Sequence, residues 1–453
     1  MLENLSNYEP NIVGISVHSA IVEPDTVTIA RKIKERNSNT KVVLGGYHPT
    51  GEIIEYDRGN LNRTLLHSDD VDFVVYGEGE ETFLALSKDL ENGNNGENVM
   101  GIALKNNGEL IVNPRRQRTD FRSLPWPSRY KEILKSSRCA PLAYPSPNNQ
   151  RAAAQISGSR GCPYNCDFCS SMTVWPVETK TKFGRYKGEK VVQYRDPSDF
   201  VDEMQWLQDE HGVNYFTLTD LTFNFDQEFA VSVSEEIRRR GVGHRPNGRN
   251  DIGWFAYATT DKTVKNPDVI EKMAEAGCTR VGIGLESLHS GILEEHKPNN
   301  SYENERESLQ IVESQGIMNR SYLIVGWPDE TSEMFDETQD ILLSGELPID
   351  QLRIAFVVPF LGTRLYEKYK NRLLTRDWRK YSGDFPVVRN DNMTDEEMKD
   401  KVKNMLKSFY ESNSYRDHVK NKVGRFPHLR ESFGYWQEYL QKREIIEESH
   451  ELI

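Results

Sequence analysis

Short apolar runs alternate with amphipathic segments through the first hundred residues. The pattern predicts buried strands at 11–17, 41–46 and 71–80, and residues 25–36 carry the 3.6-residue periodicity of a helix. A further helix is expected after the third strand. Strands this short and apolar that alternate with helices indicate a parallel α/β sheet.

The same rhythm returns between residues 151 and 366, with strands about 30–40 residues apart, as a (β/α) barrel would give. Six strands are predicted there, at 153–157, 215–220, 254–258, 280–284, 321–325 and 351–356. Parallel strands place functional groups at their carboxyl ends, so polar residues at those ends are the candidates for a site.

Two segments depart from this alternation. Residues 101–150 read as a connector, with a hairpin around Asn106-Asn107-Gly108 and proline-rich extended pieces after it. Residues 367–453 are charged and helix-patterned with scattered aromatic residues, which indicates a helical cap over the barrel mouth or a subunit interface. The predicted domains are therefore 1–100, 101–150, 151–366 and 367–453.

Composition excludes several classes of protein. The 453 residues carry a formal net charge of −13, which disfavours nucleic acid or anionic lipid as the main partner and suits a cationic substrate. No apolar stretch approaches the roughly 18 residues of a membrane span. The N-terminus lacks the apolar core of a signal peptide. Only five cysteines are present, which fits a reducing, cytoplasmic location.

Three of these cysteines, Cys162, Cys166 and Cys169, stand in a C-x3-C-x2-C pattern within a glycine-led loop. Thiolates at this spacing can turn inward on one soft metal centre, and iron–sulfur clusters usually need four ligands. No fourth cysteine lies nearby, so one iron would stay open to bind and reduce a substrate. The alternative, a structural zinc site, normally uses paired knuckles, and no second Cys or His pair follows.

The loop resembles the signature of the radical S-adenosylmethionine (SAM) superfamily, Cys-x3-Cys-x-aromatic-Cys, with Phe168 at the aromatic position next to the adenine. The resemblance implies a partial (β/α)6 barrel and a [4Fe–4S] cluster whose free iron chelates SAM. One electron, from a donor such as flavodoxin or ferredoxin, then cleaves SAM to a 5′-deoxyadenosyl radical that removes hydrogen from the substrate.

Later segments extend the resemblance to the ends of the fourth and fifth barrel strands. Gly284-Leu285-Glu286-Ser287 matches the family's Gly-Ile-Glu-Ser, which implies that Gly284, Glu286 and Ser287 contact SAM. An acidic residue at a strand end could instead cap the next helix.

Gly326-Trp327-Pro328-Asp329-Glu330-Thr331 resembles the family's Gly-Leu-Pro-Gly-Glu-Thr, where backbone groups of Gly326, Trp327 and Pro328 would meet the adenine. Trp327 and Asp329 depart from that pattern, so the local shape differs. Pro359-Phe360-Leu361-Gly362-Thr363 matches a turn after the sixth strand that is as readily a tight βα turn as a cofactor contact.

Two residues of the second barrel strand are candidates for substrate chemistry. Asp220 ends this strand and could hold a substrate amine or act as a base for a hydroxyl proton. Tyr215 could give a phenolic proton or a hydrogen atom, although a tyrosine in an aromatic strand is more often part of the core.

Residues 11–100 resemble the cobalamin-binding domain that precedes the barrel in many radical SAM enzymes. The shared pieces are the Ser16 strand, the Gly45–Pro49 turn and the Gly77–Glu80 loop. The domain's first strand, loop and helix, which often carry a cobalt-ligating histidine, do not precede them here. A truncated domain that binds no corrinoid is therefore expected, and His18 and His48 would matter only if it held a cofactor.

Three functions remain open. Overall resemblance favours a lyase that dehydrates a 1,2-diol, as in C3′ deoxygenation of the amino sugar paromamine in apramycin-type aminoglycoside biosynthesis, with an NADPH-dependent reductase as partner. The first alternative is a cobalamin-dependent radical SAM methyltransferase in natural-product biosynthesis. The second is a non-catalytic iron–sulfur protein, against which the SAM-contact segments argue.

Overall fold

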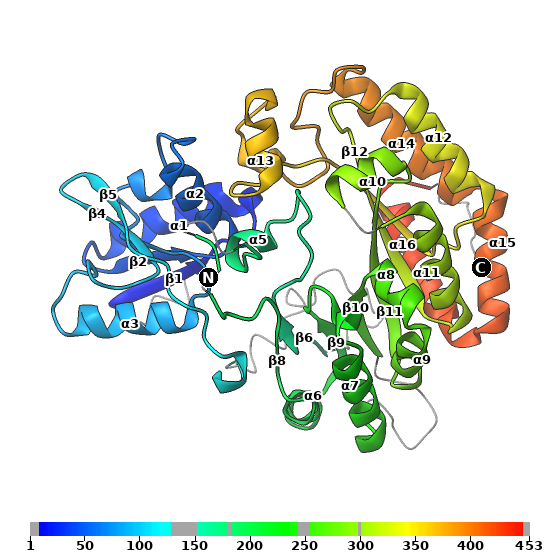
Figure 1. Ribbon diagram of the computed structural model, residues 1–453, viewed down its shortest axis with the longest axis horizontal. Helices are drawn as coiled ribbons and strands as arrows, with labels where there is room; N and C mark the ends of the chain where they lie inside the picture. Colours follow the sequence, from blue (N-terminus) through cyan, green and yellow to red (C-terminus); the bar gives the residue numbers. More distant parts are fainter. Residues whose placement is uncertain are drawn as a thin grey trace. The chain divides into compact units, whose positions relative to one another are not determined.

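The computed structural model describes residues 9–127, 152–178, 183–185, 187–242, 253–297 and 300–446 (Figure 1). The chain divides into two compact units, each built from three stretches of sequence. The first comprises 1–120, 161–191 and 357–389; the second comprises 121–160, 192–356 and 390–453.

The first unit contains a five-stranded sheet in the order β1-β2-β3-β4-β5. Strands β1 (Ile12–Ser16), β2 (Lys41–Gly45) and β3 (Phe73–Val75) are parallel, whereas β4 (Ile102–Asn106) and β5 (Glu109–Val112) form an antiparallel hairpin. The three parallel strands fall where the alternation of the sequence predicts them. The hairpin pairs with β3, so the sheet continues past the predicted boundary at residue 100.

Helices α1 (Glu23–Arg36), α2 (Tyr47–Asp57) and α3 (Glu80–Glu91) follow the parallel strands. Gly46, with φ of +111°, makes the tight turn from β2 into α2, where an added Cβ would lie 2.8 Å from the Val17 carbonyl oxygen. Later parts of the chain complete this unit with the short helices α5 (Ser171–Val174) and α13 (Arg364–Tyr369).

The second unit contains a six-stranded parallel sheet in the order β13-β12-β11-β10-β9-β6. Its strands are β6 (Ala152–Ile156), β9 (Val213–Leu218), β10 (Gly253–Ala258), β11 (Cys278–Glu286), β12 (Met318–Val325) and β13 (Gln351–Phe356). All six correspond to predicted strands. This open arrangement of parallel strands and intervening helices confirms the predicted α/β partial barrel.

Helices between consecutive barrel strands bury apolar residues against the sheet. They are α6 (Pro197–His211), α7 (Gln227–Arg240), α8 (Thr260–Lys265), α9 (Pro267–Glu275), α10 (Ser290–His296), α11 (Tyr302–Ser314) and α12 (Ser332–Ser344). Helix α6 shows how the sequence sets these bounds. Asp196 caps its first turn, and Gly212, in the left-handed conformation, ends it.

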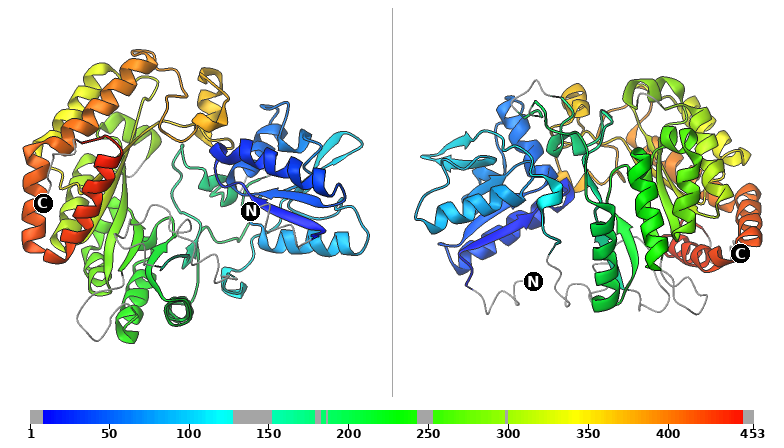
Figure 2. Two further views of the ribbon diagram at one scale, coloured as in Figure 1. Left: turned by 180° about the vertical axis from the view of Figure 1, so that it is seen from behind. Right: turned by 60° about the horizontal axis from the view of Figure 1, so that its bottom comes forward.

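The C-terminal helices α14 (Asp395–Glu411), α15 (Asn413–Arg425) and α16 (Arg430–Lys442) lie along the β13 edge (Figure 2, orange and red). The Tyr410 hydroxyl accepts a hydrogen bond from the Leu352 N–H at 2.6 Å and donates one to the Leu352 carbonyl at 2.9 Å. An unpaired sheet edge is a liability for aggregation, so these helices, predicted as a cap or an interface, protect the last strand. No helix in the described part of the chain is long and apolar enough to cross a membrane.

Candidate functional site

The three motif cysteines lie in the first unit, in a loop that precedes α5. The Cys169 N–H donates to the Cys166 carbonyl at 3.3 Å, and the Met172 N–H donates to the Cys169 carbonyl at 3.4 Å, so tight turns order the second half of the motif. All three thiols are partly exposed and none is in a disulfide. A short loop with three accessible soft ligands fits a [4Fe–4S] cluster.

The other two cysteines differ from these. Cys278 is buried, and burial raises the pKa of its thiol, so it is an inert core residue. Cys139 lies outside the described residues.

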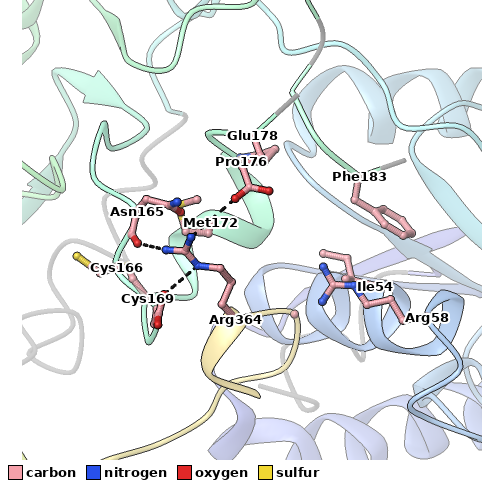
Figure 3. A pocket seen from close by; sticks show the side chains of 12 residues that line it. Ile54, Arg58, Asn165, Cys166, Cys169, Met172, Pro176, Glu178, Phe183 and Arg364 are labelled. Carbon is pink, nitrogen blue, oxygen red and sulfur yellow. Dashed lines mark hydrogen bonds and ion pairs between the residues drawn. The ribbon is translucent and has the colours of Figure 1, made fainter. Parts of the chain in front are cut away.

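Arg364, the first residue of α13, holds the cysteine loop (Figure 3). Its Nε lies 2.9 Å from Asp167 Oδ1, and its guanidinium also donates to the Asn165 carbonyl. The Leu365 N–H donates to the Asp167 carbonyl at 3.0 Å. The predicted 359–363 turn therefore has a clear structural role: Thr363 caps α13, which places Arg364 against the loop.

Removing this contact should weaken cluster binding. We expect Arg364→Ala to retain the cluster about tenfold less well, at the lower end of the range for residues that orient metal ligands, because half of this side chain is exposed. Iron and sulfide content after a timed chelator challenge measures the effect. Arg379→Ala, which breaks an exposed pair with Asp377, is the control. Equal iron loss from both variants would contradict the role of Arg364.

Asp220, which follows β9 in the second unit, is completely buried. It accepts hydrogen bonds from the Gly158 N–H at 3.0 Å and from the Ser159 hydroxyl at 2.5 Å. Burial raises its pKa to about 6, although both hydrogen bonds act in the opposite direction. Gly158 and Ser159 stand just before the cysteine loop in sequence, so Asp220 anchors the strand end that leads into that loop. Its role in catalysis stays a prediction.

The structure also places Tyr215 and Phe168, which were predicted to contact the substrate and the adenine. Tyr215 is buried within β9, between the paired residues Ala153 of β6 and Gly253 of β10. Phe168 is partly exposed in the cysteine loop. The proposed roles of both remain predictions.

Glu286 at the end of β11 has an unusual backbone, with φ of +69°. Its carboxylate folds back over Gly284, where an added Cβ would lie 2.0 Å from Glu286 Oε1. Lys297 Nζ donates to the Gly284 carbonyl and lies 3.7 Å from Glu286 Oε1. Burial raises the pKa of Glu286 and Lys297 lowers it, with a net rise. The motif therefore presents a charged pair at the strand end, which can bind both ends of a zwitterionic amino acid group.

Ser287, next in the motif, is tied to the following turn, because its hydroxyl accepts a hydrogen bond from the His289 N–H at 3.1 Å. This bond orders the start of α10, as a strand-end cap would. A contact between Ser287 and SAM stays a prediction.

The turn after β12 is organised by Glu330, a buried carboxylate that accepts hydrogen bonds from the Gly326 N–H at 2.6 Å and the Trp327 N–H at 3.2 Å. The Trp327 ring is fully buried and stacks on His296 with centroids 4.0 Å apart. Trp327 and Pro328 thus belong to a rigid turn, in which the larger side chain of Trp327 fills the core. Their contact with SAM remains a prediction.

In the first unit, ligands would be expected at the carboxyl ends of the parallel strands. There Trp175, from the segment after the cysteines, donates from Nε1 to Glu78 Oε1 at 2.8 Å and packs edge-on against Tyr47 at 5.9 Å. Arg118 Nε lies 3.3 Å from the same Glu78 oxygen. The Trp175 ring therefore lies beside the residues that follow β2 and β3, where a ligand of this sheet would be expected.

Sequence reasoning missed Arg364, Lys297 and Trp175. Arg364 follows a recognisable Gly-Thr helix start, which was the one local signal available. No sequence motif marks Lys297 or Trp175. Their roles depend on contacts with Glu286 and Glu78, which local sequence patterns do not predict.

Comparison with known proteins identifies the central part of the chain. Residues 156–342 match the family model described as radical SAM superfamily. The chain is 29% identical over 412 residues to the uncharacterized methyltransferase PH0819 of Pyrococcus horikoshii, covering 90% of this chain and 80% of that one. It is 23% identical over 419 residues to the anaerobic magnesium-protoporphyrin IX monomethyl ester cyclase of Cereibacter sphaeroides, covering 90% of this chain and 61% of the cyclase.

Solved structures show the same fold. OxsB, described as a cobalamin-dependent SAM radical enzyme with aqua-cobalamin and SAM bound, gives a TM-score of 0.67 at 16% identity over 98% of this chain and 64% of its own. TsrM of Kitasatospora setae, with cobalamin and a [4Fe–4S] cluster bound, gives 0.59 at 17% identity over 82% of this chain and 66% of its own. At these identities the likeness establishes the fold alone.

These relatives support some of the predicted functions and not others. They support the radical SAM assignment, and with it SAM and an iron–sulfur cluster. They give no support to diol dehydration of an aminoglycoside precursor or to lyase activity, and they favour the methyltransferase alternative. Both solved structures contain cobalamin, but their likeness to this chain concerns the fold, so the expected absence of cobalamin stays a prediction.

Proposed function

We propose that this protein, whose residues 156–342 match the radical SAM family model, is a radical SAM methyltransferase acting on a small molecule. The observation that carries the proposal is the 29% identity to a methyltransferase over 90% of the chain. The cysteine triad and the polar strand ends of the barrel support the same class of chemistry.

The residues predicted for chemistry in each unit would have a separate task. Cys162, Cys166 and Cys169 would hold the cluster, which when bound supplies the electron that cleaves SAM. In the second unit, the Glu286 carboxylate would accept a hydrogen bond from the SAM amino group, and the Lys297 ammonium group would pair with the SAM carboxylate. Gly284 leaves room for the backbone to approach the ligand.

Whether the first unit can bind a corrinoid bears on the choice between methyl transfer and diol dehydration. Because the Trp175 ring lies beside the strand ends of the first unit, no step of the proposed methyl transfer is assigned to cobalamin. This position of the ring favours a second candidate that needs no corrinoid, the dehydration of a 1,2-diol in a cationic amino sugar. A separate NADPH-dependent reductase would then complete the deoxygenation, and a flavodoxin or ferredoxin would reduce the cluster in either case.

Product analysis separates the two candidates. The anaerobically reconstituted protein is given a reductant and SAM carrying a trideuterated methyl group, with paromamine or a fractionated metabolite extract, each with and without methylcobalamin. Label in a product matched by S-adenosylhomocysteine supports methyl transfer. Loss of water from paromamine matched by 5′-deoxyadenosine supports dehydration. Unlabelled, unchanged substrates with 5′-deoxyadenosine alone overturn both reactions but keep the radical SAM assignment.

The position of Trp175 leads to a prediction about the affinity of the protein for cobalamin. We expect Trp175→Ala to bind hydroxocobalamin about tenfold more tightly than the unaltered protein, because the corrinoid no longer has to break a hydrogen bond to a carboxylate worth about 1.5 kcal/mol. Equilibrium dialysis followed by absorbance measures both constants. Trp126→Ala is the matched control, since Trp126 also donates from Nε1 to a carboxylate, that of Asp199, at 2.9 Å. Equal affinity in all three proteins would show that Trp175 does not restrict the site.

A further inference from the structure

Two clusters in the described part of the chain bring a histidine and two carboxylates together, with ligand atoms all within 4.8 Å of one another. One is Glu313, Asp350 and His418 in the second unit. The other is Glu23, His48 and Glu52 in the first unit. They differ in what neutralises their charge.

The cluster around Asp350 already contains a cation. The fully buried Lys422 places its Nζ 2.6 Å from Asp350 Oδ2 and 2.5 Å from Glu313 Oε2. It also donates to the Ile317 carbonyl at 2.9 Å. An ammonium group therefore fills the position that a metal ion would take, and this cluster is a structural ion network.

The cluster around His48 joins α1 to α2 without such a cation. His48 Nε2 lies 2.7 Å from Glu23 Oε2. Among the residues that the structure describes, no lysine or arginine pairs with Glu23 or Glu52. Two carboxylates thus face one imidazole in a largely buried place, and charges in such places are normally paired or bind metal.

Glu52 shows that this charge is poorly compensated. Its side chain is 5% exposed, and its Oε2 accepts a hydrogen bond from the Leu65 N–H at 3.0 Å. No hydrogen bond to its other oxygen is found within the described residues.

A cavity of about 710 Å³ opens beside the cluster and is lined by Glu23 and Glu52. Its other polar lining residues are Asn60, Asn62, Arg63, Thr64, His67, Ser68 and Arg376. Apart from Arg63 and Arg376, whose guanidinium groups cannot ligate a metal, these side chains offer oxygen or nitrogen atoms as further ligands of an ion held by the cluster.

We propose that Glu23, His48 and Glu52 bind a divalent transition-metal ion of the manganese or zinc type, with its open coordination positions facing this cavity. Two carboxylates and one imidazole are a ligand set that suits these ions. The two carboxylates also balance the charge of a divalent ion. The site is separate from the cysteine loop in sequence and ligand chemistry, so it does not depend on which reaction the barrel performs.

The test uses the full chain with its cluster in place, so that the motif cysteines are occupied and cluster iron is counted apart from manganese and zinc. After equilibration with Mn²⁺ or Zn²⁺ and gel filtration, we expect one ion per chain by mass spectrometric metal analysis. Glu52→Gln should weaken binding more than tenfold, beyond the smallest effects of residues that only orient ligands. Glu55→Gln is the control, because Glu55 is equally buried in α2 but pairs with Arg58 and Asn60.

Thermal unfolding distinguishes a variant that has lost a metal ligand from one that is misfolded. A ligand that binds the folded chain alone stabilises it by about 2.7 kcal/mol at one hundred times its dissociation constant, so metal should raise the Tm of the unaltered protein. Glu52→Gln should unfold cooperatively, and the same metal concentration should raise its Tm by no more than about half as much. The proposal would be overturned if the unaltered protein bound neither Mn²⁺ nor Zn²⁺. It would also be overturned if Glu52→Gln and His48→Ala bound these ions as tightly as the unaltered protein.

Discussion

Replacing Cys166 with alanine is expected to abolish both the cluster and SAM cleavage. A [4Fe–4S] cluster held by three thiolates keeps two protein ligands in the variant, so two of its irons lack a protein ligand and the cluster is readily lost. We expect 5′-deoxyadenosine formation to fall by more than about 100-fold, beyond the range for residues that only orient ligands. Iron and sulfide content, the visible absorbance of the cluster and chromatography of 5′-deoxyadenosine measure the effect together.

Cys278→Ala provides the matched control, because it removes a buried thiol without touching the loop. It should keep the full iron content and the full rate of SAM cleavage. A Cys166→Ala protein that retains four irons and cleaves SAM would contradict the assignment of the triad. Loss of iron from Cys278→Ala to the same extent would point to general misfolding as the cause.

Asp220→Asn is expected to lower product formation by more than about 100-fold if its carboxylate is the base in the reaction, the lower end of the range for general base catalysis. The asparagine keeps one acceptor for Gly158 and Ser159, so iron content and SAM cleavage without substrate should change little. A residue that only anchors the loop would instead lose iron, SAM cleavage and product in parallel. The ratio of product to 5′-deoxyadenosine distinguishes the two roles.

The pH dependence of Asp220 gives a second measurement on the same variant. With a pKa of about 6, product formation should rise as pH increases through 6, where the carboxylate forms, and this rise should be absent in Asp220→Asn. Stability should change in the opposite sense. Between about pH 4 and 6 the folded chain holds a proton that the unfolded chain has released, so the free energy of unfolding falls as pH rises, by at most about 3 kcal/mol.

Asp226→Asn is the control for both measurements, because Asp226 is a cap whose Oδ1 accepts from the Phe229 N–H at 3.0 Å and an asparagine serves there equally well. A pH profile of product formation that is identical in the unaltered protein and Asp220→Asn would rule out the base role. Equal pH dependence of unfolding in the unaltered protein and Asp220→Asn would show that the Asp220 carboxyl does not titrate in this range.

The alternation of apolar strands and amphipathic helices was enough to predict the parallel strands of both sheets. All six barrel strands lie where their apolar runs indicated, because the residues of each strand that pack against the surrounding helices must be apolar. The three cysteines were found for a similar reason: the ligands of one cluster lie within eight residues, and local spacing alone brings them together.

Interactions between distant segments could not be predicted in this way. The hairpin at 102–112 was expected as a connector, yet its backbone pairs with β3, a choice made by hydrogen bonds that no local pattern encodes. The C-terminal helices were expected as a cap or an interface. They lie along β13, because the last strand of an open sheet leaves unpaired groups that Tyr410 can satisfy.

The sequence by itself thus determined the fold class, the cysteine triad and the positions of the strand ends, since each depends on periodicity or short spacing. Only the tertiary structure decided what surrounds those positions. Arg364 on the cysteine loop, Lys297 beside Glu286, Trp175 over Glu78 and the joining of Glu23 to His48 each connect residues that local sequence rules treat separately. The energy of a charge or a hydrogen bond depends on the partner that burial brings to it, and that partner is chosen by folding of the whole chain.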